Sequence, residues 1–309
     1  MPRNNLLALM KNVLVIYFTQ SGQLEQIAKQ VTKPFLGASD VSLSFYQIKP
    51  EKPYPFPWNK ANFFDVFPES FLQIPTALEA VPEEIAGKKY DLILLFYQVW
   101  YLTPSIPINS FLKSPEAKVI FDNTPVVTIS GSRNMWFMAQ QKVKVLLEKN
   151  KADLKGNIAL VDRAGNLISV ITIVEWMFSG VKKRYLGIFP LPGVSEKDIN
   201  DSSKFGEVIL SSLRENKLDE LQPKLIAIKA VKYSSYLVTV DKTANKIFSK
   251  WSNFLITKKE SRKVWLKAFN VYLLLAIWLI SPIVYILHVF TYPFKINKIK
   301  EDEKYHQGV

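Results

Sequence analysis

Val13-Leu-Val-Ile-Tyr-Phe-Thr-Gln-Ser-Gly-Gln-Leu24 is the stretch of sequence that decides the fold of this chain. Its first part, Val13 to Tyr17, is a short β-branched and aromatic run, which predicts a buried strand. A hydroxyl-rich loop follows, and from Leu24 onward apolar residues recur at helical spacing. A strand that enters a helix through such a loop directs backbone N–H groups, hydroxyls and the positive end of the helix dipole at one point. The stretch therefore predicts a phosphate site after the first strand.

The loop has a hydroxyl-x-hydroxyl-Gly pattern, which differs from both the Walker A loop and the GxGxxG loop. It resembles the phosphate loop of flavodoxin-like proteins, which hold the monophosphate of FMN. The alternative interpretation is an ordinary strand-to-helix turn that Ser21 caps. If the resemblance holds, the phosphate end of FMN is bound by Thr19, Gln20, Ser21, Gly22, Gln23 and Leu24.

The composition limits the chemistry that this chain of 309 residues can perform. It has no cysteine, which excludes disulfides, cysteine–metal sites and a cysteine nucleophile. Its two histidines, His288 and His306, lie near the C-terminus, so we expect neither a histidine-based triad nor a metal site in the main body. Chemistry there has to rely on a cofactor or on Tyr, Lys, Arg and carboxylate side chains.

Strand and helix patterns alternate along the first two-thirds of the chain, which is typical of a parallel sheet with helices on both faces. We predict an α/β fold over residues 11–215, a flavodoxin-like doubly wound sheet that binds its ligand at the carboxyl ends of the strands. The five expected strands cover residues 13–17, 41–48, 90–97, 125–130 and 154–161.

Two insertions interrupt this pattern. The Pro- and aromatic-rich segment 49–70 is predicted to be irregular and to cover a pocket or pack on a partner. The second insertion, 163–186, contains the apolar run 167–178, which is too short to span a membrane. That run could form a buried element, a lid over an apolar pocket or an interfacial helix.

Two further loops, 98–105 and 131–136, follow strands and should converge with the first loop on one site. The first of them is expected to border an isoalloxazine ring, with Trp100 or Tyr101 stacked on it, and the second to contact the polar edge of the ring. Trp100 as a core aromatic and Arg133 as a surface residue remain the alternatives. The expected ring contacts are Gln98, Val99, Trp100, Tyr101, Leu102, Ser130, Gly131, Ser132, Arg133 and Asn134.

The C-terminal part, 216–309, is a basic helical tail. Residues 223–309 carry 15 Lys and Arg against 5 Asp and Glu, so this part supplies +10 of the net charge of +13. This local charge argues against a nucleic-acid surface and for anionic lipid as the partner. Residues 268–294 contain no formal charge, have basic flanks on both sides and carry Pro282 near the middle. We expect a Pro-broken hairpin in one leaflet with both ends cytosolic; a kinked single span and a buried helical hairpin in a soluble dimer are the alternatives.

With these segments assembled, the chain resembles a particular flavodoxin-like family, the proteins of dialkylresorcinol biosynthesis found beside ketosynthases in aryl-polyene and flexirubin-type pigment clusters. The resemblance covers about residues 11–210, and the Pro-aromatic insertion makes it specific. The matching stretches are LVIYFTQSGQLEQI, IKPEKPYPFPW, FFDVFPESFL, YQVWYLTPSIPINSFLKS, SGSRNMW, NIALVDRAGNLISV and YLGIFPLPGVS.

The resemblance implies an FMN-dependent aromatase that oxidises a 2,5-dialkylcyclohexane-1,3-dione, made by the partner ketosynthase, to the dialkylresorcinol. It also implies a bacterial protein, which the tail would hold at the cytoplasmic face of the inner membrane. We expect Tyr101 or Glu175 to act as the base and Arg133 to hold the enolate oxygen. A membrane-associated NAD(P)H:quinone reductase, a flavin-free membrane tether for a biosynthetic partner, and a homodimer remain open alternatives.

Overall fold

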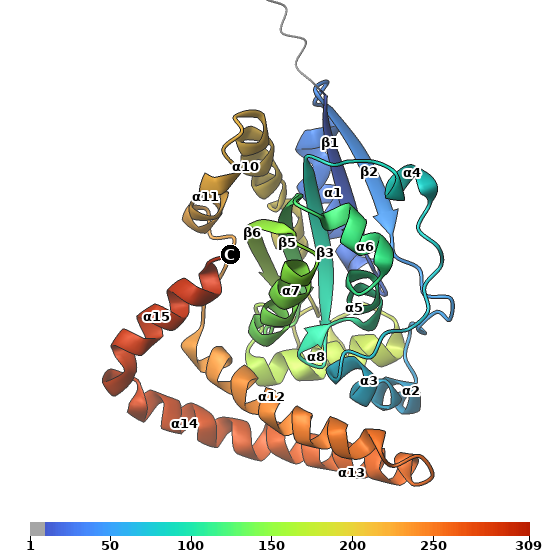
Figure 1. Cartoon of the computed structure of the whole chain (residues 1–309). Helices are drawn as coiled ribbons and strands as arrows, with labels where there is room; N and C mark the ends of the chain where they lie inside the picture. Colours follow the sequence, from blue (N-terminus) through green and yellow to red (C-terminus); the bar gives the residue numbers. More distant parts are fainter. Residues whose placement is uncertain (1–9) are drawn as a thin grey trace, which may run out of the picture.

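Five parallel strands form the centre of the protein in the computed structural model, which describes residues 10–309 (Figure 1). Their order across the sheet is β2-β1-β3-β5-β6. This is the doubly wound order of flavodoxin, so the predicted fold class is confirmed. A two-residue strand, β4 (Thr103–Pro104), folds back antiparallel on the end of β3. The parallel strands are β1 (Lys11–Tyr17), β2 (Val41–Gln47), β3 (Leu92–Trp100), β5 (Pro125–Ser132) and β6 (Asp153–Val161).

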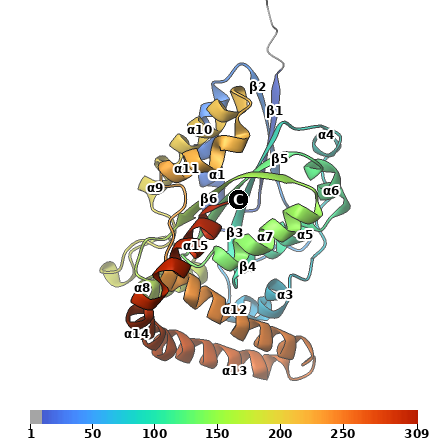
Figure 2. The same ribbon diagram turned by 60° about the vertical axis from the view of Figure 1, so that its left-hand side comes forward.

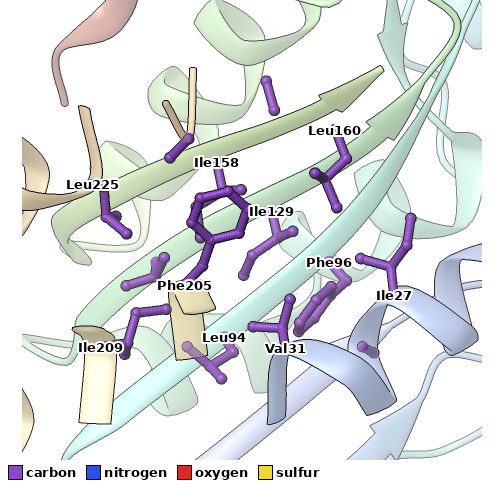
Figure 3. Close-up of a cluster of buried hydrophobic side chains, with 14 of the residues drawn as sticks. Ile27, Val31, Leu94, Phe96, Ile129, Ile158, Leu160, Phe205, Ile209 and Leu225 are labelled. Carbon is purple, nitrogen blue, oxygen red and sulfur yellow. The ribbon is translucent and has the colours of Figure 1, made fainter. Parts of the chain in front are cut away.

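Helices cover both faces of the sheet because the central strands are apolar on both sides. In β3, Leu94 and Phe96 pack into one core, which Figure 3 shows, while Ile93 and Leu95 pack into the other. The first core is covered by α1 (Gln23–Leu36), α9 (Glu196–Asn200), α10 (Ser203–Arg214) and α11 (Leu221–Ala227). The second is covered by α4 (Glu83–Ala86), α5 (Ile106–Leu112), α6 (Pro115–Phe121) and α7 (Phe137–Lys149).

The Pro-aromatic insertion is only partly irregular. Its second half forms two short helices, α2 (Lys60–Asp65) and α3 (Phe67–Phe71), so the expectation of an irregular segment is wrong there. The reason is where the prolines stand: most lie in 53–57, and Pro68 occupies the first turn of α3, where a missing N–H costs no hydrogen bond.

The apolar run of the second insertion forms α8 (Asn166–Ser179), which lies below the carboxyl ends of the strands (Figures 1 and 2). Its buried side chains are Ser169, Thr172 and Trp176, whereas Ile168 and Val174 are exposed. The helix therefore turns a partly polar face inward and an apolar face outward, the reverse of an ordinary surface helix.

The expected boundary at residue 216 does not interrupt the packing. Leu221 and Leu225 of α11 belong to the first core, and Gly156 of β6 lies against both. Beyond α11, the chain forms α12 (Ser235–Ile256), α13 (Arg262–Leu275), a π-helical turn (Ala276–Ile280), α14 (Ser281–Thr291) and α15 (Ile296–Gln307).

The hydrophobic segment of the tail does not form the expected Pro-broken hairpin. α13, the π turn and α14 make one continuous helix of 30 residues, Arg262–Thr291. The wider turn comes immediately before Pro282, where the backbone has to adjust to the missing N–H of the proline. By length and composition, this is the one helix in the described part of the chain that could cross a membrane.

The contact between α1 and α10 supplies a test of the fold. A Cβ atom on Gly206 would lie 1.8 Å from the carbonyl oxygen of Val31, a distance that only a shift of one helix can relieve. We expect Gly206→Ala to lower the free energy of unfolding by about 3 kcal/mol, measured by urea denaturation. Gly37→Ala is the matched control, because its Cβ would meet nothing within 4 Å. Equal stability of the two variants would contradict this packing.

Candidate active site

A cavity of about 130 Å³ lies at the carboxyl ends of β1 and β3, where the strand order reverses. Doubly wound sheets bind their ligands at this switch point. The three loops expected to converge do so, and α8 and a glycine near α9 close the cavity. The lining residues are Gln20, Ser21, Gln23, Leu24, Ile27, Gln98, Val99, Trp100, Gly131, Ser132, Arg133, Ile173, Trp176, Met177 and Gly193.

The loop after β1 is not the Ser21-capped turn of the alternative interpretation. Gly22 occupies the N-cap of α1 with φ of 82°, a conformation that favours glycine, and no side chain caps the helix. The Ser21 side chain lines the cavity instead. Thr19 stands just before it, and its buried hydroxyl oxygen has no hydrogen-bond partner among residues 10–309. Of the six residues expected to hold the phosphate, Gln20, Ser21, Gln23 and Leu24 line the cavity, whereas Thr19 and Gly22 lie beside it in the same loop. The first N–H groups of α1 have no side-chain cap.

The segment after β3 differs from the expected loop. Gln98, Val99 and Trp100 continue the strand and line the cavity, while Tyr101 and Leu102 take positive φ angles of 47° and 63° in a tight hairpin. That hairpin turns both of these residues away from the cavity.

Tyr101 is therefore not placed to stack on a ring or to act as a base. Its hydroxyl donates to the carbonyl oxygen of Phe63 at 2.5 Å, and its ring packs 5.1 Å from that of Phe67. Burial raises the pKa of the Tyr101 phenol well above its ordinary value, which disfavours the phenolate further.

The loop after β5 contributes Gly131, Ser132 and Arg133 to the cavity wall. Gly131 permits the close approach of α1, since a Cβ there would lie 2.8 Å from Leu24 Cδ1. The remaining expected contacts do not line the cavity: Ser130 is buried in the sheet, and Asn134 donates to Asn166 Oδ1 at 3.2 Å.

Arg133 lines the cavity and also connects the loop after β5 to α8, so the alternative that it is a surface residue is wrong. Its guanidinium donates to the carbonyl oxygen and Oδ1 of Asn166, both at 2.9 Å, and to Ser169 Oγ at 3.0 Å. Burial lowers its pKa to about 10, so it stays charged at neutral pH. All three of these hydrogen bonds come from Nη1, which fixes the guanidinium against α8 and places its positive charge in the cavity wall.

α8 lines a part of the cavity for which the sequence predicted no residue. A lid over an apolar pocket was one of the three alternatives for the apolar run 167–178. Ile173, Trp176 and Met177 face the cavity, and Glu175, the expected base, does not line it. Gly193 and Ile27 also line the cavity, although the sequence did not predict them as site residues. Gly193 has φ of 77°, and a Cβ there would lie 2.7 Å from Gln23 Oε1. The Pro-Gly pair at 192–193 was the available signal for such a turn.

The Pro-aromatic insertion bridges the first loop and α8 behind the residues that line the cavity, and none of its own residues lines the cavity. Gln20 Nε2 donates to the carbonyl oxygen of Pro55 at 2.9 Å, and the Trp58 N–H donates to that of Met177 at 2.8 Å. The rings of Tyr54 and Trp58 pack edge-on against Trp100, with centroids 5.1 and 5.7 Å away. One side of the cavity is consequently an aromatic wall.

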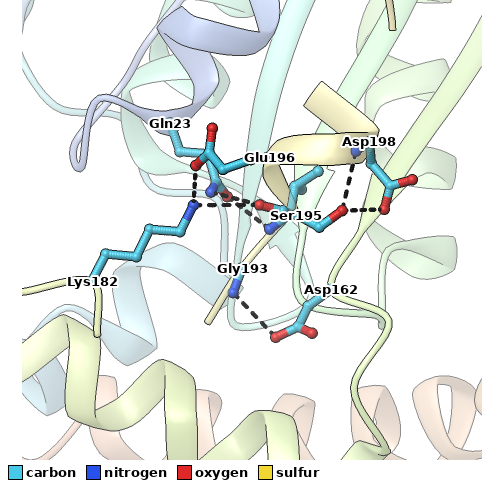
Figure 4. A network of polar contacts seen from close by, with 8 residues as sticks. Gln23, Asp162, Lys182, Gly193, Ser195, Glu196 and Asp198 are labelled. Atoms are coloured by element: carbon cyan, nitrogen blue, oxygen red, sulfur yellow. Dashed lines mark hydrogen bonds and ion pairs between the residues drawn. The ribbon is translucent and has the colours of Figure 1, made fainter. Parts of the chain in front are cut away.

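A polar network fastens the segment before α9 to the first turn of α1 (Figure 4). Gln23 exchanges two hydrogen bonds with the backbone of Val194, at 3.0 and 3.1 Å. Asp162, which follows β6, accepts from the Gly193 N–H at 3.2 Å, and Lys182 pairs with Glu196 at 2.8 Å. These bonds hold the cavity wall at Gly193.

The donor set of the cavity suits a phosphorylated flavin. Gln98 Nε2 and Ser132 Oγ are buried and, like Thr19 Oγ1, have no partner among residues 10–309. Leaving such an atom unsatisfied costs about 1–3 kcal/mol, so the two that belong to cavity-lining residues, Gln98 and Ser132, indicate a polar ligand. Pockets for ligands of this size usually measure about 300–1,000 Å³. A three-ring system therefore fits only if α8 moves outward or the ring extends past the mouth of the cavity.

Comparison with known proteins gives similarity of structure alone. No protein-family model and no curated protein matches this sequence. A flavoprotein from Lactobacillus acidophilus in complex with FMN is 16% identical, with a TM-score of 0.39 over 48% of this chain and 93% of that one. A flavodoxin mutant from Fusobacterium nucleatum bound to flavin mononucleotide is 12% identical, with a TM-score of 0.30 over 48% and 69%. The Trp repressor binding protein of Bacillus subtilis is also 12% identical, with a TM-score of 0.29 over 56% and 100%.

A buried carboxylate of the tail lies behind the Arg133 loop. Asp241 of α12 is fully buried, and its Oδ2 accepts from the Met138 N–H at 3.1 Å in the first turn of α7. Burial raises its pKa from 3.8 to about 6 against the opposing effect of Lys142 and Arg133. Because the folded state binds this proton more tightly, the contribution of Asp241 to stability is most favourable below about pH 4, falls between pH 4 and 6, and stays lower above.

Asp241→Asn should remove the loss of stability that ionisation of Asp241 causes above about pH 4. The amide oxygen still accepts the hydrogen bond from the Met138 N–H, but it carries no buried charge. The difference between 3.8 and about 6 corresponds to roughly 3 kcal/mol. We expect the variant to gain stability relative to the original protein by about 2–3 kcal/mol between pH 4 and pH 7.5, measured by urea denaturation. Glu207→Gln, on the exposed surface of α10, is the control. A difference that does not change with pH would contradict this account.

Proposed function

We propose that the cavity binds FMN and that the protein is a flavin-dependent oxidoreductase. The observation that carries the proposal is the set of unpartnered polar atoms at the β1/β3 switch point, beside a loop whose hydroxyls cap nothing. Thr19, Ser21 and the N–H groups that begin α1 would hold the phosphate. Gln98 and Ser132 would contact polar atoms of the flavin, and Trp100 would border its ring.

We further infer that the substrate is a lipophilic cyclohexane-1,3-dione, which the protein oxidises to a dialkylresorcinol. This substrate class comes from the sequence resemblance, and the absence of cysteine excludes the condensation step itself. Aromatisation removes two hydrogens from the ring, one as hydride and one as a proton, and bound FMN would supply the two-electron acceptor.

The protein's own residues would bind and orient this ring. No carboxylate, histidine or tyrosine lines the cavity in the described chain, and the only charged side chain there is Arg133. Its positive charge favours the enolate form of a 1,3-dione, which ionises readily without an enzymatic base. Trp100, Trp176 and Met177 would exclude water and contact the alkyl groups. Glu175 and Tyr101 carry no role in this scheme.

Reconstitution with FMN tests the cofactor. We expect the purified protein to bind FMN and quench its fluorescence, and Thr19→Val and Ser21→Ala each to raise the Kd about tenfold or more, because each removes a hydrogen bond to a charged phosphate. Ser211→Ala, beside Arg214 and far from the cavity, should bind like the original protein. A protein that stays colourless with FMN would favour the membrane tether.

Anaerobic reduction separates the enzymatic alternatives. We expect a 2,5-dialkylcyclohexane-1,3-dione to bleach the bound flavin while one equivalent of resorcinol forms, followed by absorbance and chromatography. Bleaching by NADH or NADPH but not by the dione would assign the protein to quinone reduction instead. The reaction requires bound FMN, but FMN binding does not require the reaction. Failure of the reaction alone therefore leaves the flavoprotein assignment intact, whereas failure of the titration removes both.

A further inference from the structure

The continuous helix Arg262–Thr291 exposes far more apolar surface than a soluble monomer normally shows. Between residues 271 and 294, fourteen large apolar or aromatic side chains are exposed, among them Trp278, Leu279, Ile286 and Phe290. The start of the helix packs through Leu266 and Phe269 against α12 and the aromatic insertion. Further along, one side of the helix contacts α12 again, where Ser281 lies 2.9 Å from the Tyr236 hydroxyl and His288 lies 3.1 Å from the Ser235 hydroxyl, and the other sides stay exposed. An apolar surface of this extent requires a cover.

Unpaired cations surround this apolar surface. Six exposed lysines near the two ends of the helix have no ion-pair partner among residues 10–309, in contrast to Arg262, which pairs with Asp65 and Glu69. They are Lys259, Lys263, Lys267, Lys295, Lys298 and Lys300. Trp265, Tyr285 and Tyr292 add exposed aromatics of the kind that lie at the level of lipid headgroups. Cations and aromatics around an apolar face complement an anionic bilayer surface.

The first end of the helix is tied to the globular body. Arg262 Nε donates to Asp65 Oδ1 at 2.6 Å, and Arg262 Nη2 donates to Glu69 Oε2 at 2.7 Å. These two carboxylates belong to α2 and α3, the helices of the Pro-aromatic insertion, which also contacts cavity-lining residues through Gln20, Trp100 and Met177.

The second end returns to the same body. After Thr291, α15 runs back to α12 and α7, where Lys242 pairs with Asp302 at 3.3 Å and Tyr305 donates to Gln141 at 2.6 Å. His306 is buried, with its ring 5.3 Å from that of Phe137. Figures 1 and 2 show the helix lying along α12 at the carboxyl-end side of the sheet, with the chain folding back at its end.

We propose that this helix lies flat in the interface of an anionic bilayer and does not cross it. At 1.5 Å per residue its 30 residues measure about 45 Å, enough to span a hydrocarbon core of about 30 Å. A span, however, would put α15 on the opposite side from the body and break every contact that α15 makes. The in-plane orientation keeps both ends attached and buries only the exposed apolar face.

α8 carries a second group of exposed apolar side chains. Ile168 and Val174 of α8 and Leu186 and Ile188 of the following segment are exposed, and α8 itself lies at the same end of the molecule as the exposed helix (Figures 1 and 2). A bilayer that covers them would account for the reversed polarity of α8. The lid of the cavity would then face lipid.

Vesicle flotation tests the partner. We expect the full chain to float with phosphatidylglycerol-containing vesicles, to bind pure phosphatidylcholine at least tenfold more weakly, and to lose at least tenfold in binding in the double variant Leu279→Glu/Ile286→Glu. Val119→Glu/Val145→Glu is the matched control, since it places the same two charges on exposed apolar residues of α6 and α7. A soluble dimer that ignores both kinds of vesicle would overturn the proposal.

Cysteine labelling tests the orientation, and the chain offers a background free of cysteine. Glu260→Cys and Asn297→Cys mark the two ends of the helix, and Val119→Cys marks the body. In bacterial membranes from cells expressing each variant, a membrane-impermeant maleimide should label all three from the same side. If the two ends label from opposite sides, the helix spans the bilayer and the proposal fails.

Discussion

The close seating of α1 on its neighbours is the constraint on which the rest of the molecule depends. On the sheet side, Gly131 lies against the Leu24 side chain, where a Cβ would require that side chain to move. On the other side, only a glycine at 206 leaves room for the backbone carbonyl of Val31, which fixes how closely α10 packs on the helix. Its first turn is therefore held at the carboxyl end of β1, where its N–H groups and the hydroxyls of the preceding loop face the cavity.

The additions to the minimal fold all gather around that point. The Pro-aromatic insertion joins the first loop to α8 through Gln20 and Trp58, and the Arg133 guanidinium ties α8 to the end of β5. The same insertion pairs with Arg262 at the start of the exposed helix. The cavity, α8 and the exposed helix Arg262–Thr291 are thus connected to one another through contacts of the insertion and of Arg133.

Much of the site was predictable because it depends on strand ends. Ten of the sixteen expected cofactor contacts line the cavity, since the carboxyl ends of parallel strands meet at one edge whatever the side chains. The proposed catalytic residues fared worse for a physical reason. Tyr101 follows Trp100 directly, but two positive φ angles turn it into an aromatic cluster, and Glu175 stands one residue from Trp176 yet on a different face of α8.

By itself the sequence determined the layers of this protein, because strand and helix periodicity, buried runs and loop chemistry are local properties of the chain. It also determined what chemistry is impossible, through the missing cysteine and the remote histidines. Only the tertiary structure decided that the apolar run 167–178 is a lid with its polar side inward, and that Pro282 sits in a continuous helix. Both depend on which surfaces meet: an apolar run alone does not say which face is covered, and a proline alone does not say whether the backbone before it can widen to accept it.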